Sequence, residues 1–152
     1  MNSSGYTNRQ RAPLCYLIAL PGVTCVITAI AMLDEEGFHL FLLIMGLSAF
    51  FFYLALAFRW LETSDQGDHL LIRFGPLPSF WKRVKYEGVR GVKRDRSLLI
   101  EGWGIHLGPR GWVWNLWGRE VVELEREEGR LRIGTDDPEG LIAHFRARCE
   151  LS

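Results

Sequence analysis

Two long apolar runs dominate the first part of the chain. Residues 13–33 contain no charged side chain, and residues 38–58 contain only His39 as an ionisable group. Each run matches the roughly 20 residues that a helix needs to cross the hydrocarbon of a bilayer. Neither run has the polar face, with a period of 3.6 residues, of a surface helix in a soluble protein. The pattern predicts a transmembrane helical hairpin over residues 13–60, with spans at about 13–33 and 38–58.

Neither a soluble hairpin nor a signal peptide accounts well for these runs. A buried helical hairpin in a soluble protein would need a core that covers both helices, and the rest of the chain, about 90 residues, is too short for this. A signal peptide would have an apolar run of roughly 7–15 residues, which the first run exceeds, and a second run follows at once. We therefore expect both runs to be membrane spans.

The charged residues beside the runs predict the orientation of the hairpin. Arg9 and Arg11 precede the first run, and Arg59 follows the second. The connection at residues 34–37 is acidic and contains no Lys or Arg. By the positive-inside rule, both termini face the cytoplasm, and the protein is expected in the cytoplasmic (inner) membrane. Residues 1–12 are expected to form a loose polar tail on that side.

Short segments of β-type pattern replace the long runs from Leu61 onward. Most of them alternate apolar and polar residues, and turns rich in Gly and Pro separate them, which is typical of β-strands. The predicted strands are residues 61–65, 69–74, 80–86, 89–95, 104–107, 112–115, 120–125 and 130–134. The fourth has a weaker alternation, which is typical of a bulged strand.

A single helix is predicted at the end of the chain, over residues 137–149. Asp136 or Asp137 can cap its first turn, where Pro138 is also favourable. Its apolar stripe consists of Leu141, Ile142, Phe145 and Cys149. The predicted fold class is an α+β membrane protein. The two-helix hairpin is followed by a cytoplasmic antiparallel β-domain of about seven or eight strands, residues 61–152, with one C-terminal helix.

Several stretches of this region resemble a known family. They are HLLIRFGPLP, FWKRVKYEGVRGVKRD, GWGIHLGPRGWVWNLWGREVVELE and GRLRIGTDDPEGLIAHF. These stretches, and the order of strands followed by one helix, resemble the pleckstrin-homology-like (PH-like) domains that some bacterial proteins carry on membrane hairpins. The resemblance covers residues 61–148 and implies a PH-like fold on a membrane anchor. It implies no activity, because that group has no settled function.

Small residues recur at spacings that place them on helix faces. Ala19, Gly22 and Ala29 can share one face of the first span, and Gly46 and Ala49 can share a face of the second. Small residues at such spacings let helices approach closely. These faces can pack the hairpin on itself or bind another membrane subunit, and the first alternative is the favoured one.

Basic residues are concentrated in one part of a chain that is neutral as a whole. The 18 Lys and Arg residues balance 18 Asp and Glu residues, so nothing points to nucleic-acid binding. The concentrated cations are Lys82, Arg83, Lys85, Arg90, Lys93 and Arg94, followed by Arg96. Near an anionic leaflet, such residues can contact lipid head groups or an acidic partner. The simpler interpretation is an ordinary solvated strand face.

The β-domain is also rich in tryptophan. Trp81 and Trp103 are joined by Trp112, Trp114 and Trp117. Aromatic side chains dominate both cores and interfaces, so these residues can pack inside the domain or dock a partner. The candidate docking residues are Trp112, Trp114 and Trp117, and the first two are the best because alternate positions of a strand share one face.

No catalytic or metal-binding motif occurs in the chain. His69, His106 and His144 are scattered, and there is no nucleophile elbow, phosphate loop or zinc spacing. We therefore predict no cofactor and a non-catalytic interaction module that docks a protein partner or membrane complex. Expected partners are membrane lipids and other membrane proteins or a second copy. The alternative is a sensor of anionic lipid head groups, and an enzyme with His106 in a polar pocket is a distant third.

Overall fold

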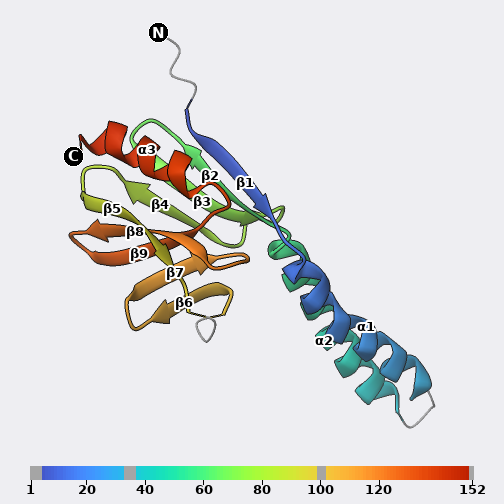
Figure 1. The fold of residues 1–152 in the computed structure, drawn as a ribbon. Coiled ribbons are helices and arrows are strands. Elements are labelled where there is room, and N and C mark those ends of the chain that lie inside the picture. The colour runs from blue at the N-terminus through green and yellow to red at the C-terminus, as the bar shows by residue number, and fades with distance from the viewer. Residues whose placement is uncertain (1–4, 33–36, 99–101, 151–152) are drawn as a thin grey trace.

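The computed structural model describes residues 5–32, 37–98 and 102–150. The predicted apolar helices are present as α1 (Leu14–Ala31) and α2 (Phe38–Ala57), and both are long and apolar enough to cross a membrane. Figure 1 shows them as a hairpin that projects from one end of the β-domain. The predicted acidic connection lies outside the described residues except for Gly37.

The β-strands form two sheets with α3 (Pro138–Cys149) beside them. The first sheet has the order β1-β2-β3-β4, and the second has the order β5-β8-β9-β7-β6. The strands of the first sheet are β1 (Thr7–Arg11), β2 (Trp60–Asp65), β3 (His69–Gly75) and β4 (Trp81–Lys85). Those of the second are β5 (Val89–Arg96), β6 (Gly104–Gly108), β7 (Gly111–Asn115), β8 (Glu120–Arg126) and β9 (Gly129–Gly134). All eight predicted strands are present, and β5 has the expected irregularity, a register shift between Val89 and Gly91.

The prediction of a loose N-terminal tail is wrong for Thr7–Arg11, which form β1. This strand pairs with β2 in antiparallel register, with Arg11 opposite Trp60 and Thr7 opposite Ser64. β1 leads into α1 within two residues, and α2 leads into β2 within two residues. The helical hairpin therefore brings the two strands together, although the sequence of β1 has no apolar alternation of its own.

The prediction of a purely antiparallel domain is also wrong at one place. β7 and β9 are parallel, with Trp112 opposite Leu131 and Trp114 opposite Ile133. The reason is the order of the second sheet. β8 runs opposite to β7 but lies one position away from it, and β9 turns back into the gap between them. Two successive reversals make β9 parallel to β7.

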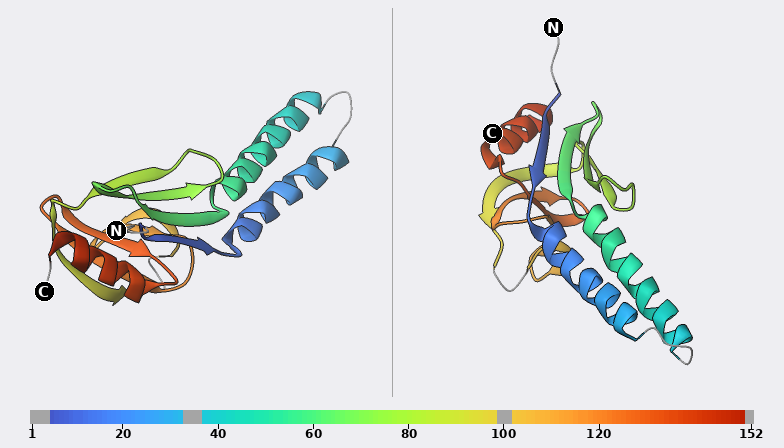
Figure 2. Two further views of the ribbon diagram at one scale, coloured as in Figure 1. Left: turned by 90° about the horizontal axis from the view of Figure 1, so that it is seen from above. Right: turned by 90° about the vertical axis from the view of Figure 1, so that its right-hand side faces the viewer.

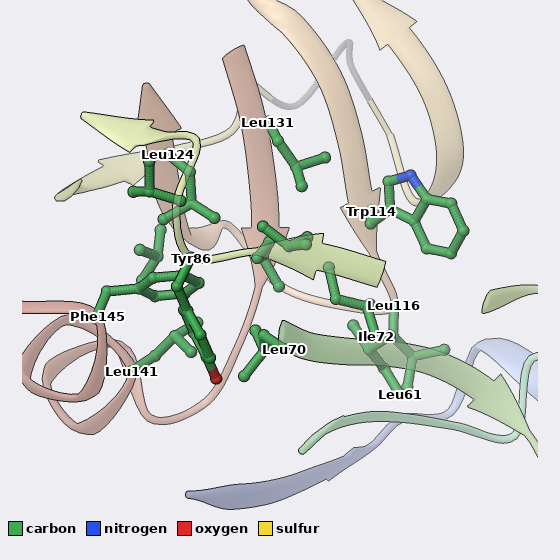
Figure 3. Close-up of a cluster of buried hydrophobic side chains, with 14 of the residues drawn as sticks. Leu61, Leu70, Ile72, Tyr86, Trp114, Leu116, Leu124, Leu131, Leu141 and Phe145 are labelled. Carbon is green, nitrogen blue, oxygen red and sulfur yellow. The ribbon is translucent and has the colours of Figure 1, made fainter. Parts of the chain in front are cut away.

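One cluster of buried side chains is shared by both sheets and α3 (Pro138–Cys149). Figure 3 shows Leu70 and Ile72 from β3 beneath Leu124 and Leu131 from the second sheet, with Phe145 of α3 closing one side. The predicted stripe of α3 is confirmed, because Leu141 and Phe145 are fully buried and Ile142 and Cys149 pack against the cluster. Asp137 caps the helix by accepting a hydrogen bond from Gly140 N at 3.0 Å.

The hairpin of α1 and α2 lies at one end of the β-domain, and α3 lies at the other. Figure 2 shows this arrangement in both views, with α1 and α2 leaving the domain away from α3 and from the C-terminus. Contacts of α2 with the domain occur at its C-terminal end. The ring of Phe58 lies 4.9 Å from that of Phe74 and 5.3 Å from that of Phe80, and the hydroxyls of Tyr53 and Ser79 are hydrogen-bonded. The β3–β4 connection therefore lies beside the end of the hairpin.

Candidate docking surface

The strand β4 has an uncovered edge. It pairs with β3 on one side, and no other described strand pairs with it. Two clefts, of about 290 and 340 Å³, lie along it. The first is lined by Ser79, Phe80, Trp81, Lys82, Ile105, Trp112 and Trp114. The second is lined by Arg83, Lys85, Glu87, Gly88, Arg126, Glu127 and Glu128. We call the two clefts together the β4 groove.

The first cleft lies between the start of β4 and the β6–β7 hairpin, and its rim is aromatic. Trp81 is 52% exposed and Trp112 is 45% exposed. Leu107, the register partner of Trp112 on β6, is 67% exposed. These side chains belong to an apolar surface that continues from the core, since Trp114 and Ile105 of the same cleft pack against the buried cluster.

The three predicted docking tryptophans have different surroundings. Trp112 stays half exposed, whereas Trp114 is 8% exposed and its ring lies 5.9 Å from that of Phe74. Trp117 is half-buried and stacks on Trp103 with ring centroids 4.0 Å apart. Alternation along β7 therefore gives Trp112 and Trp114 one face of the sheet, but it is the Trp114 ring that packs on Phe74 of the first sheet. Of the three, Trp112 alone is presented to a partner.

The predicted basic cluster is divided between the two sheets. On β5, the cations are paired with glutamates of β8 and of the β8–β9 turn. These pairs are Arg90–Glu127 at 2.7 Å, Lys93–Glu123 at 3.1 Å, Arg94–Glu120 at 2.8 Å and Arg96–Glu120 at 2.7 Å. On β4, by contrast, Lys82, Arg83 and Lys85 make no ion pair within the described part of the chain. The guanidinium of Arg83 lies over the Trp81 ring, 5.2 Å from its centroid.

A cluster around Trp60 joins the helices to the first sheet. Arg9 lies 4.5 Å and Arg73 5.2 Å from the Trp60 ring centroid, and both donate hydrogen bonds to Glu62. Burial acts to raise the pKa of Glu62, but these hydrogen bonds outweigh it and lower the pKa. A Cβ atom at Gly75 would lie 2.1 Å from the Trp60 ring, so glycine is required there. The sequence does not predict this cluster, because Arg9 belongs to the unpredicted strand.

A second polar cluster fixes the end of β4 to α3. Tyr86 donates a hydrogen bond to Asp65 at 2.8 Å and lies 2.9 Å from Nε2 of His144. Arg148 donates to the same carboxylate at 2.5 Å. Burial acts to raise the pKa of Asp65, but hydrogen bonds from Gly67 N, Arg148 and Tyr86 lower it. Burial lowers the pKa of His144, which favours the neutral imidazole.

The predicted small-residue faces of the hairpin differ in their contacts. Gly22 and Ala29 of α1 are buried, and the Gly22 carbonyl accepts a hydrogen bond from the Ser48 hydroxyl of α2 at 2.8 Å. Ala19 lines a third cleft between the helices, of about 410 Å³. Gly46 and Ala49 are exposed, and a Cβ atom at Gly46 would meet nothing within 4 Å. The α1 face therefore packs the hairpin, whereas the α2 residues contribute no packing to it.

The remaining predicted chemistry concerns His106. Its Nε2 atom is buried without a hydrogen-bond partner among the described residues, and His106 lines none of the three clefts described above. Within the described ranges, no group of three or more His, Cys, Asp or Glu side chains is arranged to hold a metal ion. The three free cysteines are only partly exposed. The β4 groove therefore remains the main candidate site.

Comparison with known proteins does not extend this description. No protein-family model matches the chain, and no curated protein matches it. The functional argument therefore rests on the arrangement of the described residues.

Proposed function

We propose that the protein is a non-catalytic interaction module, anchored in the cytoplasmic membrane by α1 and α2, that docks a protein partner or membrane complex at the cytoplasmic face. The observation that carries this proposal is the β4 groove, where a free strand edge lies beside exposed aromatic side chains. The cations of β4 protect this edge from indiscriminate pairing, but large apolar side chains are rarely exposed beside a strand edge without a partner. Tryptophan is also among the residues that contribute most to binding energy at interfaces.

The membrane anchor is supported by the surface of the hairpin. Large apolar side chains are exposed around both helices, among them Leu43 at 69% and Ile27 at 64%. Apolar surface in water is unfavourable by roughly 25 cal/mol per Å², and a bilayer removes this cost. Arg9, Arg11 and Arg59 at the domain end of the helices favour a cytoplasmic β-domain.

The position of the groove favours a partner that is itself at the membrane. The β3–β4 connection contacts α2 through the Tyr53–Ser79 hydrogen bond and the Phe58–Phe80 ring contact. The first cleft begins at Ser79, so its near end lies at the level where α2 would leave the lipid. A protein that docks there approaches along the membrane surface. We further propose that the β-domain is PH-like, a proposal supported by its two sheets and single C-terminal helix.

The proposal is tested by purifying the full chain from gently solubilised membranes and measuring the mass of what copurifies. We expect a stoichiometric complex that is lost with Trp112→Ala, because truncation of a central interface tryptophan costs roughly 2–4 kcal/mol, or about 30-fold or more in affinity. Trp103→Ala is the matched control, since Trp103 is similarly exposed but does not line the groove. A wild-type chain that always runs alone would contradict the proposal.

The second candidate function is contact with anionic lipid head groups through β4. It is favoured by the absence of ion pairs at Lys82, Arg83 and Lys85 among the described residues. Hydrogen exchange of the full chain in nanodiscs tests it. Exchange in β4 should be slower in anionic than in zwitterionic lipid, and the difference should vanish when the three cations are replaced by Glu. Equal exchange of the wild type in both lipids would rule this function out.

A further inference from the structure

The backbone of β4 offers a row of hydrogen-bonding groups to the groove. Phe74 N donates to the Phe80 carbonyl at 2.9 Å, which sets the positions where β3 and β4 exchange hydrogen bonds. In an antiparallel pair, alternate residues direct their backbone groups toward the partner strand and away from it. The N–H and C=O groups of Trp81, Arg83 and Lys85 therefore point to the free edge. No described strand accepts or donates there.

The side chains of β4 differ between its two faces. Val84 is buried in the core, and Lys82 lines the first cleft with Ile105 and Trp112. Arg83 and Lys85, at the alternate positions, lie on the outer face and are exposed. A strand added beside β4 would therefore direct every second side chain toward the face of Lys82 and Val84, where the first cleft lies, and the residues between toward the face of Trp81, Arg83 and Lys85.

Charge on the opposite wall does not cancel these cations. Glu127 pairs with Arg90 at 2.7 Å, and Glu128 pairs with Arg126 at 3.3 Å. Among the described residues that line the second cleft, Glu87 is the one acid without an ion pair. On the side of β4, Lys82, Arg83 and Lys85 therefore outnumber the nearby acids, Glu87 in the cleft and Asp68, which interacts electrostatically with Arg83.

A second copy of the chain is a poor occupant of this edge. Antiparallel pairing of β4 with β4 would set Arg83 directly against Arg83 of the other copy, and a shift by two residues would set Arg83 against Lys85. Like charges directly opposite each other destabilise a strand pair. The same cations favour carboxylates in the occupant.

We propose that the β4 groove binds an extended segment of the partner protein that adds to the first sheet as a strand beside β4. In this segment acidic residues, opposite Arg83 and Lys85, alternate with large apolar residues that enter the cleft lined by Ile105, Trp112 and Trp114. Main-chain hydrogen bonds supply affinity in strand addition, and alternate side chains supply specificity. The inference rests on the proposed docking function and names the chemistry of its partner.

The test uses the purified full chain in detergent and a fluorescent ten-residue peptide of alternating Glu and Leu. Its control is a peptide of the same composition with the five Glu and five Leu residues in separate blocks. Fluorescence anisotropy should show saturable binding of the alternating peptide, at least tenfold tighter than binding of the block peptide. Hydrogen exchange should slow at the amides of Trp81, Arg83 and Lys85. Equal binding of the two peptides, or protection confined to other strands, would overturn the inference.

Three variants separate the backbone contribution from the charge. Arg83→Pro removes an outward N–H, which an edge strand tolerates, and should abolish binding of the alternating peptide. Arg83→Gln keeps the N–H and should weaken binding several-fold. Arg94→Gln removes a β5 cation that is already paired with Glu120, and binding should not change. Because Arg83→Pro could also disturb folding, its circular dichroism spectrum is compared with that of the wild type. Equal affinities for Arg83→Gln and Arg94→Gln would overturn the role of the β4 cations.

The outcomes also distinguish this inference from the docking function. A complex that depends on Trp112, together with failure of the alternating peptide, would refute strand addition and leave docking intact. Absence of the complex together with failure of the alternating peptide to bind would refute both strand addition and docking. Two further observations would refute strand addition in favour of another occupant: a dimer of the chain alone with a protected β4, or protection of β4 by anionic lipid without peptide.

Discussion

Two strands that follow each other in the sequence, β4 and β5, carry similar sets of cations but present different surfaces. Lys82, Arg83 and Lys85 lie on β4, and the next strand carries four more cations between residues 90 and 96. Each of the four on β5 contacts a glutamate within 3.1 Å. The three on β4 contact none among the described residues.

The difference comes from the neighbours of each strand. β5 pairs with β8, on which Glu120 and Glu123 stand in register opposite cations of β5. β4 pairs with β3, whose side chains opposite the cations are Ile72, Leu71 and His69. A cluster of charge in a sequence becomes a charged surface only where the adjacent strand leaves it unpaired.

The largest expected effect is on the β5 side, at Glu123. Its side chain is 1% exposed, lies 3.1 Å from Lys93 and stands in register with the buried Arg132. Glu123→Gln should lower the free energy of unfolding by about 2 kcal/mol, because Lys93 and Arg130 lose the buried carboxylate that faces them. Urea unfolding of the full chain in a mild detergent measures this.

Glu127→Gln provides the matched control for this change. Glu127 pairs with Arg90, but both side chains are more than half exposed, so the loss should stay below about 1 kcal/mol. Similar losses of stability for the two variants would show that burial of the glutamate does not determine how much an ion pair of β5 contributes to stability.

A smaller effect is expected at the end of β4, where His144 belongs to the polar cluster with Tyr86 and Asp65. Burial holds the pKa of His144 below its ordinary value, so the folded protein binds a proton there less readily than the unfolded chain. This group should cost no stability above the ordinary histidine pKa of about 6.5, and stability should fall as the pH drops below it.

The wild type and His144→Gln are compared by urea unfolding between pH 8 and pH 5, a range of about three units that spans the ordinary histidine pKa. The decrease in stability with falling pH should be shallower in the variant. An unchanged slope would place the titrating group elsewhere.

The smallest expected effect compares single exposed cations of the two strands. Arg94→Gln breaks contacts with Glu120 at 2.8 Å and with Glu139 at 3.6 Å, and should cost about 0.5 kcal/mol. Lys85→Gln breaks no ion pair among the described residues and should change stability by less than this. Differential scanning fluorimetry of both variants measures which of them loses more stability. A larger loss for Lys85→Gln would reveal a contact of β4 that its surroundings do not suggest.

Much of the fold is predictable because it depends on local patterns. The two apolar helices follow from the length of uncharged sequence, and each strand after Trp60 from short β-type segments between turns. The C-terminal helix follows from the Asp137 cap and the stripe that contains Leu141 and Phe145. In each of these elements, the signal lies within a few residues of the feature that it determines.

The candidate site depends on contacts between distant segments, which local patterns do not encode. β1 has no apolar alternation, and it is a strand because the hairpin places it beside β2. Trp112 and Trp114 share a face, yet their exposure differs because only Trp114 reaches Phe74 of the other sheet.

The sequence by itself therefore determined the two apolar helices, the eight strands from Leu61 onward and the C-terminal helix, together with a cluster of cations and a set of tryptophans. Only the tertiary structure decided which cations are paired and which tryptophans are covered. The physical reason is that the pairing of a cation and the burial of a tryptophan depend on which strand lies beside them. Local sequence patterns do not specify that neighbour, which is fixed only when both sheets have formed.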